Sequence, residues 1–215
     1  MVVPPDNSAN SSLDNLSNLT AGGVIIDIGT GDGRFVYQSA RENPSKFYVG
    51  IDANAKALEK ISMKATRKAA KGGAPNLLFV QAAIEDLPEE LNETADEIHI
   101  HFPWGSLLRA VANGDAQALR ALHRISAPGC LLEVVIGIDP DRDRAALERL
   151  DLASLSVDYL RKVLAPKYEV AGFPFRECGE VSPRDWPHLR SSWARRLQGN
   201  KQRAVVYFIA EARKV

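Results

Sequence analysis

The most constraining feature of this chain is a series of short apolar runs that alternate with helical stretches. The runs are VIIDIG (24–29), FYVGID (47–52), LLFVQA (77–82), EIHIHF (97–102) and CLLEVVIGI (130–138). Each run is continuous and is bounded by turn residues, which is typical of strands that are buried on both faces. Strands that alternate with helices predict an α/β fold, in which helices cover both faces of a mostly parallel sheet.

The remaining segments complete this sheet. CGEV (178–181) and AVVYFIA (204–210) flank a helix-like segment at 183–197, and we expect the two to close a seven-stranded sheet as a hairpin-like pair. Further helices are expected after the first run up to about Arg41, in an amphipathic stretch after residue 104, and over 54–70, 116–126 and 141–164.

Length and composition indicate one domain, because 215 residues are enough to bury a sizeable core. Residues 1–20 are rich in Asn, Ser, Asp and Pro, so we expect a polar arm there and a single domain over 21–215. The arm shows no secretory signal, and no run approaches the roughly 18 apolar residues of a membrane span, so we expect a soluble, cytoplasmic protein. Two distant cysteines without a C-x-x-C pair argue against a disulfide framework and a metal site.

The charge is zero in total but is unevenly distributed along the chain. Residues 60–73 hold five Lys or Arg and no acid, and residues 184–203 hold six against one Asp. Residues 85–97, in contrast, hold seven acids and no base. The two basic segments would form one patch if the fold brings them together, and the alternative is that each is an ordinary solvated helix face.

The first apolar run leads directly into the turn Gly29-Thr30-Gly31-Asp32-Gly33 and then into a helix. Glycines permit positive φ angles and let the main chain approach a ligand, and the amides at the helix start favour a negative group. Asp52 ends the second run, 19 residues after Gly33, where doubly wound folds hold ribose hydroxyls. Arg34 stands where a nicotinamide dinucleotide site would carry its third glycine.

The acid-flanked loop from Asp27 to Asp32 suits a cofactor with a cationic centre. It resembles the binding loop of S-adenosylmethionine-dependent methyltransferases of the Rossmann-like class, and Glu85 lies where such enzymes hold the adenine amine. Each acid could instead only cap a helix. Their shared position at strand ends favours the cofactor interpretation.

The fourth run ends in Phe102-Pro103-Trp104-Gly105, where enzymes that methylate exocyclic amines usually carry an Asp or Asn. We therefore expect a ring nitrogen with a free lone pair to be the nucleophile, with catalysis by alignment and electrostatics. A second tryptophan, Trp193, is three residues from Arg196 in the second basic segment. The two indoles could form the walls around a flipped base, at about 1–3 kcal/mol per stacked base.

Four motifs, GTGDGR, KGGAPNLLFV, FPWGSLLRAV and SSWARRL, resemble the aminoglycoside-resistance methyltransferases that modify adenosine 1408 of 16S rRNA at ring nitrogen 1. The similarity runs from about Val24 to Arg203. It implies S-adenosylmethionine as cofactor, the 30S ribosomal subunit near helix 44 as partner, and a monomeric enzyme. It also implies that Trp104 and Trp193 hold the flipped adenine and that 139–165 and 182–203 are linkers on the substrate side.

The cofactor-binding residues that the resemblance implies lie at the ends of the first four runs: Asp27, Gly29, Thr30, Gly31, Asp32, Asp52, Ala53, Ala83, Glu85, Leu87, Phe102 and Ser106. The RNA-binding residues are cations of the two basic segments: Lys64, Arg67, Lys68, Lys71, Arg196, Lys201 and Arg203. Lys201 stands where such enzymes can carry arginine, so the charge is kept but the planar fork is not. The arm at 1–20 does not obviously form the amino-terminal hairpin of the family.

Three alternatives remain open. A transfer-RNA guanine-N7 methyltransferase would carry Pro-Asp-Pro-Trp and basic residues after the fourth run, which GSLLRAV does not supply. A small-molecule methyltransferase has no use for the basic tail. A non-catalytic module that binds S-adenosylmethionine and RNA would not need both tryptophans and the full loop. His99 and His101 share one face of the fourth run, where we expect a structural role.

Overall fold

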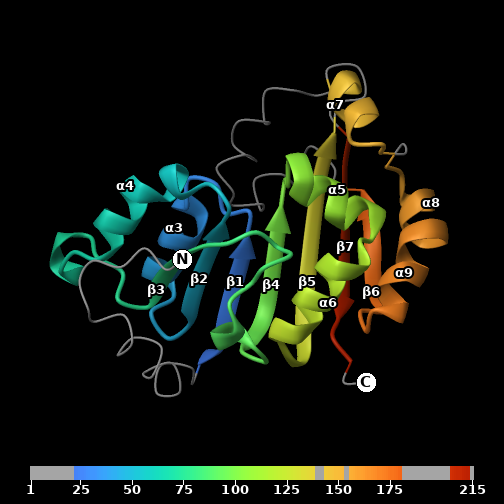
Figure 1. Cartoon of the computed structure of the whole chain (residues 1–215). Coiled ribbons are helices and arrows are strands. Elements are labelled where there is room, and N and C mark those ends of the chain that lie inside the picture. The colour runs from blue at the N-terminus through green and yellow to red at the C-terminus, as the bar shows by residue number, and fades with distance from the viewer. Residues whose placement is uncertain (1–21, 139–142, 153–154, 181–203, 214–215) are drawn as a thin grey trace.

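The computed structural model describes residues 22–138, 143–152, 155–180 and 204–213. Within these residues, seven strands form one sheet in the order β3-β2-β1-β4-β5-β7-β6 (Figure 1). The strands are β1 Val24–Ile28, β2 Phe47–Asp52, β3 Leu77–Gln81, β4 Ala95–His101, β5 Ser126–Ile138, β6 Phe175–Glu180 and β7 Ala204–Glu211. The expected arm at 1–20 and the expected helix at 183–197 lie outside the described residues.

The sheet is parallel from β3 through β5 and antiparallel at its other edge. β1 pairs with β2 and β4, β2 also pairs with β3, and β4 with β5, all in parallel. β7 runs antiparallel to both β5 and β6, which confirms the expected hairpin-like closure. Because the parallel strands run in one direction, their carboxyl ends meet at one edge of the sheet.

Helices cover both faces of this sheet, as the alternating pattern predicts (Figure 1). They are α3 Arg34–Glu42, α4 Ala55–Ala65, α5 Gly105–Asn113, α6 Ala116–Ile125, α7 Arg144–Arg149, α8 Val157–Tyr159, the π-helical η4 Leu160–Leu164 and α9 Ala165–Val170. Short 3-10 turns occur at η2 Ala69–Lys71 and η3 Glu89–Leu91. Among the described helices, none combines the length and the apolar character that crossing a membrane requires.

Strand β1 separates two hydrophobic cores, because successive side chains point to opposite faces. Val24, Ile26 and Ile28 belong to the core that includes buried residues of α5, α6 and η4. Ile25 belongs to the other core, which α3 and α4 complete. Burial on both faces explains why the run is apolar without a period of two.

Two helices are shorter than their sequence pattern predicts. The helix expected over 54–70 ends at Ala65, and the chain then folds so closely that a Cβ at Gly73 would lie 1.6 Å from the Arg67 carbonyl oxygen. The prediction of a single helix over 141–164 was also wrong. The structure has α7 there, then Asp151 at φ 51°, and a new helix start that the Ser156 hydroxyl caps.

Candidate functional site

A cleft of about 440 Å³ lies at the carboxyl ends of the parallel strands. The segments that follow β1, β2, β3 and β4 all contribute to it. The lining residues are Ile28, Gly29, Gly31, Asp52, Ala53, Asn54, Ala82, Ala83, Ile84, Glu85, Phe102, Pro103, Trp104, Gly105, Ser106 and Leu107. Open α/β sheets bind their ligands in this place, outside the carboxyl ends of the strands.

The glycine loop between β1 and α3 presents its backbone to this cleft. Gly29, Gly31 and Gly33 all have positive φ angles, between 59° and 77°. A Cβ at Gly31 would meet nothing within 4 Å, whereas a Cβ at Gly33 would collide with Phe79 and Ile61. The turn therefore needs glycine for backbone conformation at Gly31 and for close packing of α3 at Gly33.

Asp52 ties this loop to the end of β2. Its Oδ2 accepts a hydrogen bond from the Gly31 amide at 2.8 Å, and its Oδ1 accepts one from the Asn54 amide at 2.8 Å. The amides of Gly29 and Thr30 both donate to the Ile51 carbonyl, at 2.8 and 3.0 Å. An ionised carboxylate offers about four acceptor positions, so Asp52 can also accept hydrogen bonds from hydroxyl groups of a ligand in the cleft.

Most of the cofactor-binding residues expected from the sequence meet at the cleft, and four do not line it. Those that line it are Gly29, Gly31, Asp52, Ala53, Ala83, Glu85, Phe102 and Ser106. Asp27 lies within β1 and is buried, and the Thr30 amide donates to the Ile51 carbonyl of β2. The Asp32 carboxylate pairs with Arg34 at the start of α3. Leu87 belongs to the hydrophobic core.

Sequence reasoning did not assign seven further lining residues to the site: Ile28, Asn54, Ala82, Ile84, Pro103, Gly105 and Leu107. Their one usable signal is position, because each lies at the end of a strand or within a few residues after it. Apart from Asn54, they contribute apolar side chains or glycine backbone to the walls of the cleft.

Trp104 stands on the rim of the cleft and is 49% exposed. It is the N-cap residue of α5, and its backbone is extended at φ −136° and ψ 161°. An indole at the mouth of a cleft presents a large flat surface for stacking. Trp193, Arg196, Lys201 and Arg203, which were expected to act on the same substrate, lie outside the described residues.

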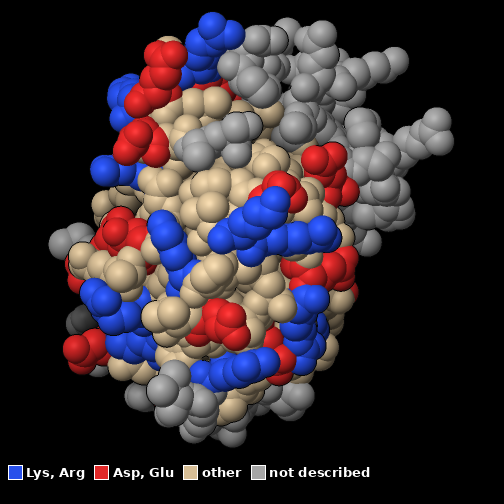
Figure 2. Space-filling view, turned by 90° about the vertical axis from the view of Figure 1, so that its right-hand side faces the viewer, with Lys and Arg blue, Asp and Glu red and all other residues tan. Residues whose placement is uncertain are grey.

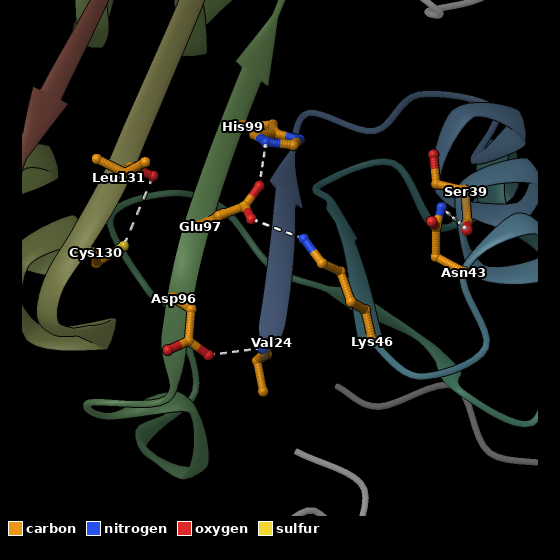
Figure 3. Close-up of polar contacts among 9 residues, drawn as sticks. All are labelled: Val24, Ser39, Asn43, Lys46, Asp96, Glu97, His99, Cys130 and Leu131. Atoms are coloured by element: carbon orange, nitrogen blue, oxygen red, sulfur yellow. Dashed lines mark hydrogen bonds and ion pairs between the residues drawn. The ribbon is translucent and has the colours of Figure 1, made fainter. Parts of the chain in front are cut away.

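A network of ionisable groups lies on the face of the sheet that α3 covers (Figure 3). Glu97 accepts a hydrogen bond from Lys46 at 3.0 Å and lies 3.5 Å from His99 Nε2. His101 Nε2 lies 2.5 Å from Glu133 Oε1, and the two histidine rings stack with centroids 5.1 Å apart. Both histidines line a separate cleft of about 420 Å³ on this face rather than the cleft around Trp104.

The network shifts the pKa values of its members in opposite directions. The hydrogen bond with His99, helped by Lys46, lowers the pKa of Glu97 to about 2 against the effect of burial. Burial opposes the charged form of His99, but Glu97 and the other nearby carboxylates outweigh it, so the pKa of His99 is raised. Burial raises the pKa of Asp27, and the electrostatic effect of the nearby His101 opposes this rise.

The four described cations expected to bind RNA are all exposed and follow one another at the end of α4: Lys64, Arg67, Lys68 and Lys71. The hydroxyl of Tyr37 donates to the Gly72 carbonyl, and Lys64 Nζ lies 4.6 Å from the centre of the Tyr37 ring. Tyr37 therefore fixes this basic segment to α3. On the opposite side of the molecule, basic and acidic side chains are interspersed (Figure 2).

Comparison with known proteins places relatives along nearly the whole chain. A family model described as NpmA, 16S rRNA (adenine(1408)-N(1))-methyltransferase, matches residues 7–212. The 16S rRNA (adenine(1408)-N(1))-methyltransferase of Streptoalloteichus tenebrarius is 38% identical over 180 residues, which cover 84% of this chain and 82% of that protein.

Solved structures agree with this result. The aminoglycoside resistance methyltransferase NpmB1 has a TM-score of 0.82 and 44% identity, and 93% of each chain is covered. A tryptophan-to-alanine mutant of the 16S rRNA (adenine(1408)-N(1))-methyltransferase from Catenulisporales acidiphilia, solved with the cosubstrate SAM, has a TM-score of 0.86 and 33% identity. The match covers 98% of this chain and 93% of that one.

The hydrogen bond between the Gly31 amide and Asp52 predicts that a substitution of Asp52 weakens cofactor binding. In Asp52→Asn, the removal of a charged hydrogen-bond acceptor should weaken S-adenosylmethionine binding by about tenfold to a hundredfold, measured by isothermal titration calorimetry. The matched control is Asp96→Asn, because Asp96 accepts a hydrogen bond from the Val24 amide at 2.7 Å at the other end of β1 (Figure 3). Equal weakening in both variants would contradict a direct role of Asp52.

The lowered pKa of Glu97 predicts a pH-dependent contribution to stability. Its pKa is about 2 in the folded chain, below its ordinary value, so the stabilisation is complete above about pH 4.5 and disappears as the pH falls toward 2. Glu97→Gln should lower the free energy of unfolding by about 1 kcal/mol at pH 7, a modest value because a third of the side chain is exposed.

Urea denaturation at pH 7, 5, 4 and 3 would measure this difference, which should shrink at the lowest pH. The control is Glu169→Gln, which changes an exposed acid of α9 and should have an effect below about 0.5 kcal/mol. A difference between wild type and Glu97→Gln that stays constant with pH would show that the ion pairs of Glu97 do not stabilise the fold.

Proposed function

The chain belongs to the family of S-adenosylmethionine-dependent 16S rRNA (adenine(1408)-N(1))-methyltransferases, and we propose that it methylates N1 of adenosine 1408 in the 30S subunit. Methylation at this position would confer aminoglycoside resistance. We further propose that the enzyme acts as a monomer in the cytoplasm, where it meets the helix 44 region of the assembled subunit.

One observation carries this proposal. The cleft that follows the parallel strands is lined by glycine backbone, by Asp52 and by the exposed indole of Trp104. The glycine backbone and Asp52 suit a nucleoside cofactor, and the indole suits a flat base that has left its helix. A cleft that serves both ligands brings a methyl donor and a base together.

The cleft fits S-adenosylmethionine in size and in chemistry. About 440 Å³ lies within the usual range for small-molecule sites, and the open side of Gly31 leaves room for close contact with the backbone. We propose that Asp52 holds the ribose hydroxyls and Glu85 the adenine amine, with Ala53, Ala83, Phe102 and Ser106 around them. The bound cofactor supplies an electrophilic methyl group on a sulfonium centre.

The residues at the turn after β4 support attack by a ring nitrogen rather than by an amine. Phe102, Pro103, Trp104 and Gly105 bring neither a carboxylate nor an amide side chain to the cleft. N1 of adenine has a free lone pair, so no proton has to be removed before it reacts. The contribution of the protein is therefore to hold the base and the methyl donor in line and to exclude water.

We propose that Trp104 and Trp193 hold the flipped adenine between their rings. The exposed indole of Trp104 in the described part of the chain supports one half of this arrangement. A base that has left its helix no longer stacks on its neighbours, and stacking on aromatic side chains compensates for this.

The basic segment after α4 is the proposed contact with the RNA backbone. Arg67, Lys68 and Lys71 are exposed. The hydrogen bond from the Tyr37 hydroxyl to the Gly72 carbonyl holds this segment against α3. We propose that Arg196, Lys201 and Arg203 extend this contact from the segment 182–203, and that 139–165 is a second linker on the substrate side. Phosphate contacts of this kind position a protein on RNA without reading its sequence.

Two other functions can be separated from this one by experiment. A non-catalytic module would bind S-adenosylmethionine and subunits without transferring a methyl group, and a transfer-RNA enzyme would leave the subunits unmodified. The sequence of the Trp104 turn, which carries no acid, disfavours the second.

The role of Trp104 predicts a defect in turnover while the cofactor still binds. Trp104→Ala should reduce methyl transfer to purified 30S subunits by about tenfold to a hundredfold, which corresponds to the stacking energy of one base, while S-adenosylmethionine affinity changes less than about threefold. Trp104→Phe keeps a flat ring and should retain more activity than Trp104→Ala. Val170→Ala, which trims another exposed apolar side chain, serves as control. Normal turnover in Trp104→Ala would refute the stacking role.

The basic segment predicts a change in salt dependence. Replacing Arg67, Lys68 and Lys71 by alanine should weaken subunit binding and lower the slope of log affinity against log salt by about one for each phosphate that is no longer neutralised. The control replaces Arg120 of α6 and Lys167 of α9, two exposed cations outside the proposed RNA-binding segments, by alanine and should leave the slope unchanged. Equal slopes in the triple variant and the control variant would place the RNA-binding surface elsewhere.

A further inference from the structure

We propose that Phe102 is a positioning residue for Trp104. We further propose that Gly137 of β5 provides the space that the ring of Phe102 needs for this role. This inference rests on the proposed function, since it concerns how the indole is held for the target base. It adds a residue, Gly137, that does not line the cleft and lies 33 positions from Trp104 in the sequence.

The backbone of Phe102 has an unusual conformation. Its φ angle is +51°, in the left-handed region, which bulky residues rarely adopt and which persists only when surrounding contacts enforce it. Its amide donates to the Val135 carbonyl at 2.7 Å, so the residue is still fixed to β5 after β4 has ended at His101. This conformation turns the chain from the strand into the Pro103-Trp104-Gly105 segment.

The ring of Phe102 lies over Gly137. A Cβ at Gly137 would be 3.0 Å from both Cδ1 and Cε1 of that ring, which is closer than ordinary van der Waals contact. The φ angle of Gly137 is not positive, so a side chain would be compatible with its backbone conformation. A side chain at this position would therefore press on the ring of Phe102, which occupies the space above Gly137.

The other end of the turn is held by a second contact of this kind. A Cβ at Gly29 would be 2.4 Å from Cδ2 of Leu107, so the first turn of α5 packs directly on the glycine loop. Trp104 lies between these two anchors, and about half of it is exposed. The orientation of the indole is therefore set mainly by the backbone on either side of Trp104. Phe102 fixes this backbone to β5, and Leu107 fixes it to the glycine loop.

The variant that tests this inference is Gly137→Ala, which pushes the ring of Phe102 out of place. Methyl transfer to 30S subunits should fall about tenfold or more, because small misplacements of a reacting group carry large rate effects. Affinity for S-adenosylmethionine should fall less than turnover does, because Gly31 and Asp52 keep their positions although Phe102 also lines the cleft. Gly179→Ala in β6 is the matched control, since its Cβ would meet the Tyr207 ring at 3.1 Å, and its turnover should stay within about twofold of wild type.

A double-mutant cycle tests whether the effect acts through Phe102. The smaller side chain in Phe102→Leu leaves room for the added methyl group, so Gly137→Ala should reduce turnover much less in that background. Additive effects of the two substitutions would overturn the inference.

A measurement without RNA separates this inference from the proposed function. In the background Trp186→Phe, Trp193→Phe, Trp104 is the single remaining tryptophan, and acrylamide quenching of its fluorescence reports its environment. Gly137→Ala should change the quenching constant, and Gly179→Ala should not. Unchanged quenching in Gly137→Ala would overturn the positioning role. If wild type shows no methylation of subunits while Gly137→Ala still changes the quenching, the proposed function fails and the positioning role of Phe102 stands.

Discussion

The pairing of β1 between β2 and β4 is the constraint on which the rest of this structure depends. Because these strands run in parallel, the segments that follow them reach the same edge of the sheet, and the cleft forms there. The Asp52 carboxylate then links the end of β2 to the Gly31 amide at 2.8 Å. A short apolar run, a glycine turn and one acid thereby form a nucleoside-sized site beside an exposed indole.

Much of the fold could be predicted from the sequence, because a strand that is buried on both faces appears there as a short, continuous apolar run. The run 47–52 coincides with β2, and the antiparallel closure by β6 and β7 also agrees. Helix ends were harder to predict. The basic stretch after Ala65 has good helix formers, but the backbone of Gly73 packs against the carbonyl of Arg67, which is a contact that no periodic pattern reveals.

The candidate site likewise contains residues that could be predicted from their position in the sequence and contacts that could not. The residues at strand ends, such as Asp52 and Glu85, were found because position along a strand is visible in sequence. Asp27 has an equally suggestive position, yet it points to the face where His99 and His101 lie and is buried there. The packing of Phe102 on Gly137 could not be predicted, because it joins two strands and depends on an unusual φ angle.

The central claim is that the cleft brings S-adenosylmethionine and adenosine 1408 together. Reverse transcription of 16S rRNA, after incubation of purified 30S subunits with the protein and the cofactor, tests it most directly. A methyl group on N1 blocks the Watson–Crick edge of adenine, so our account predicts a stop beside position 1408 that disappears when the cofactor is omitted. Uninterrupted extension through that position, with cofactor binding confirmed by calorimetry, would contradict it.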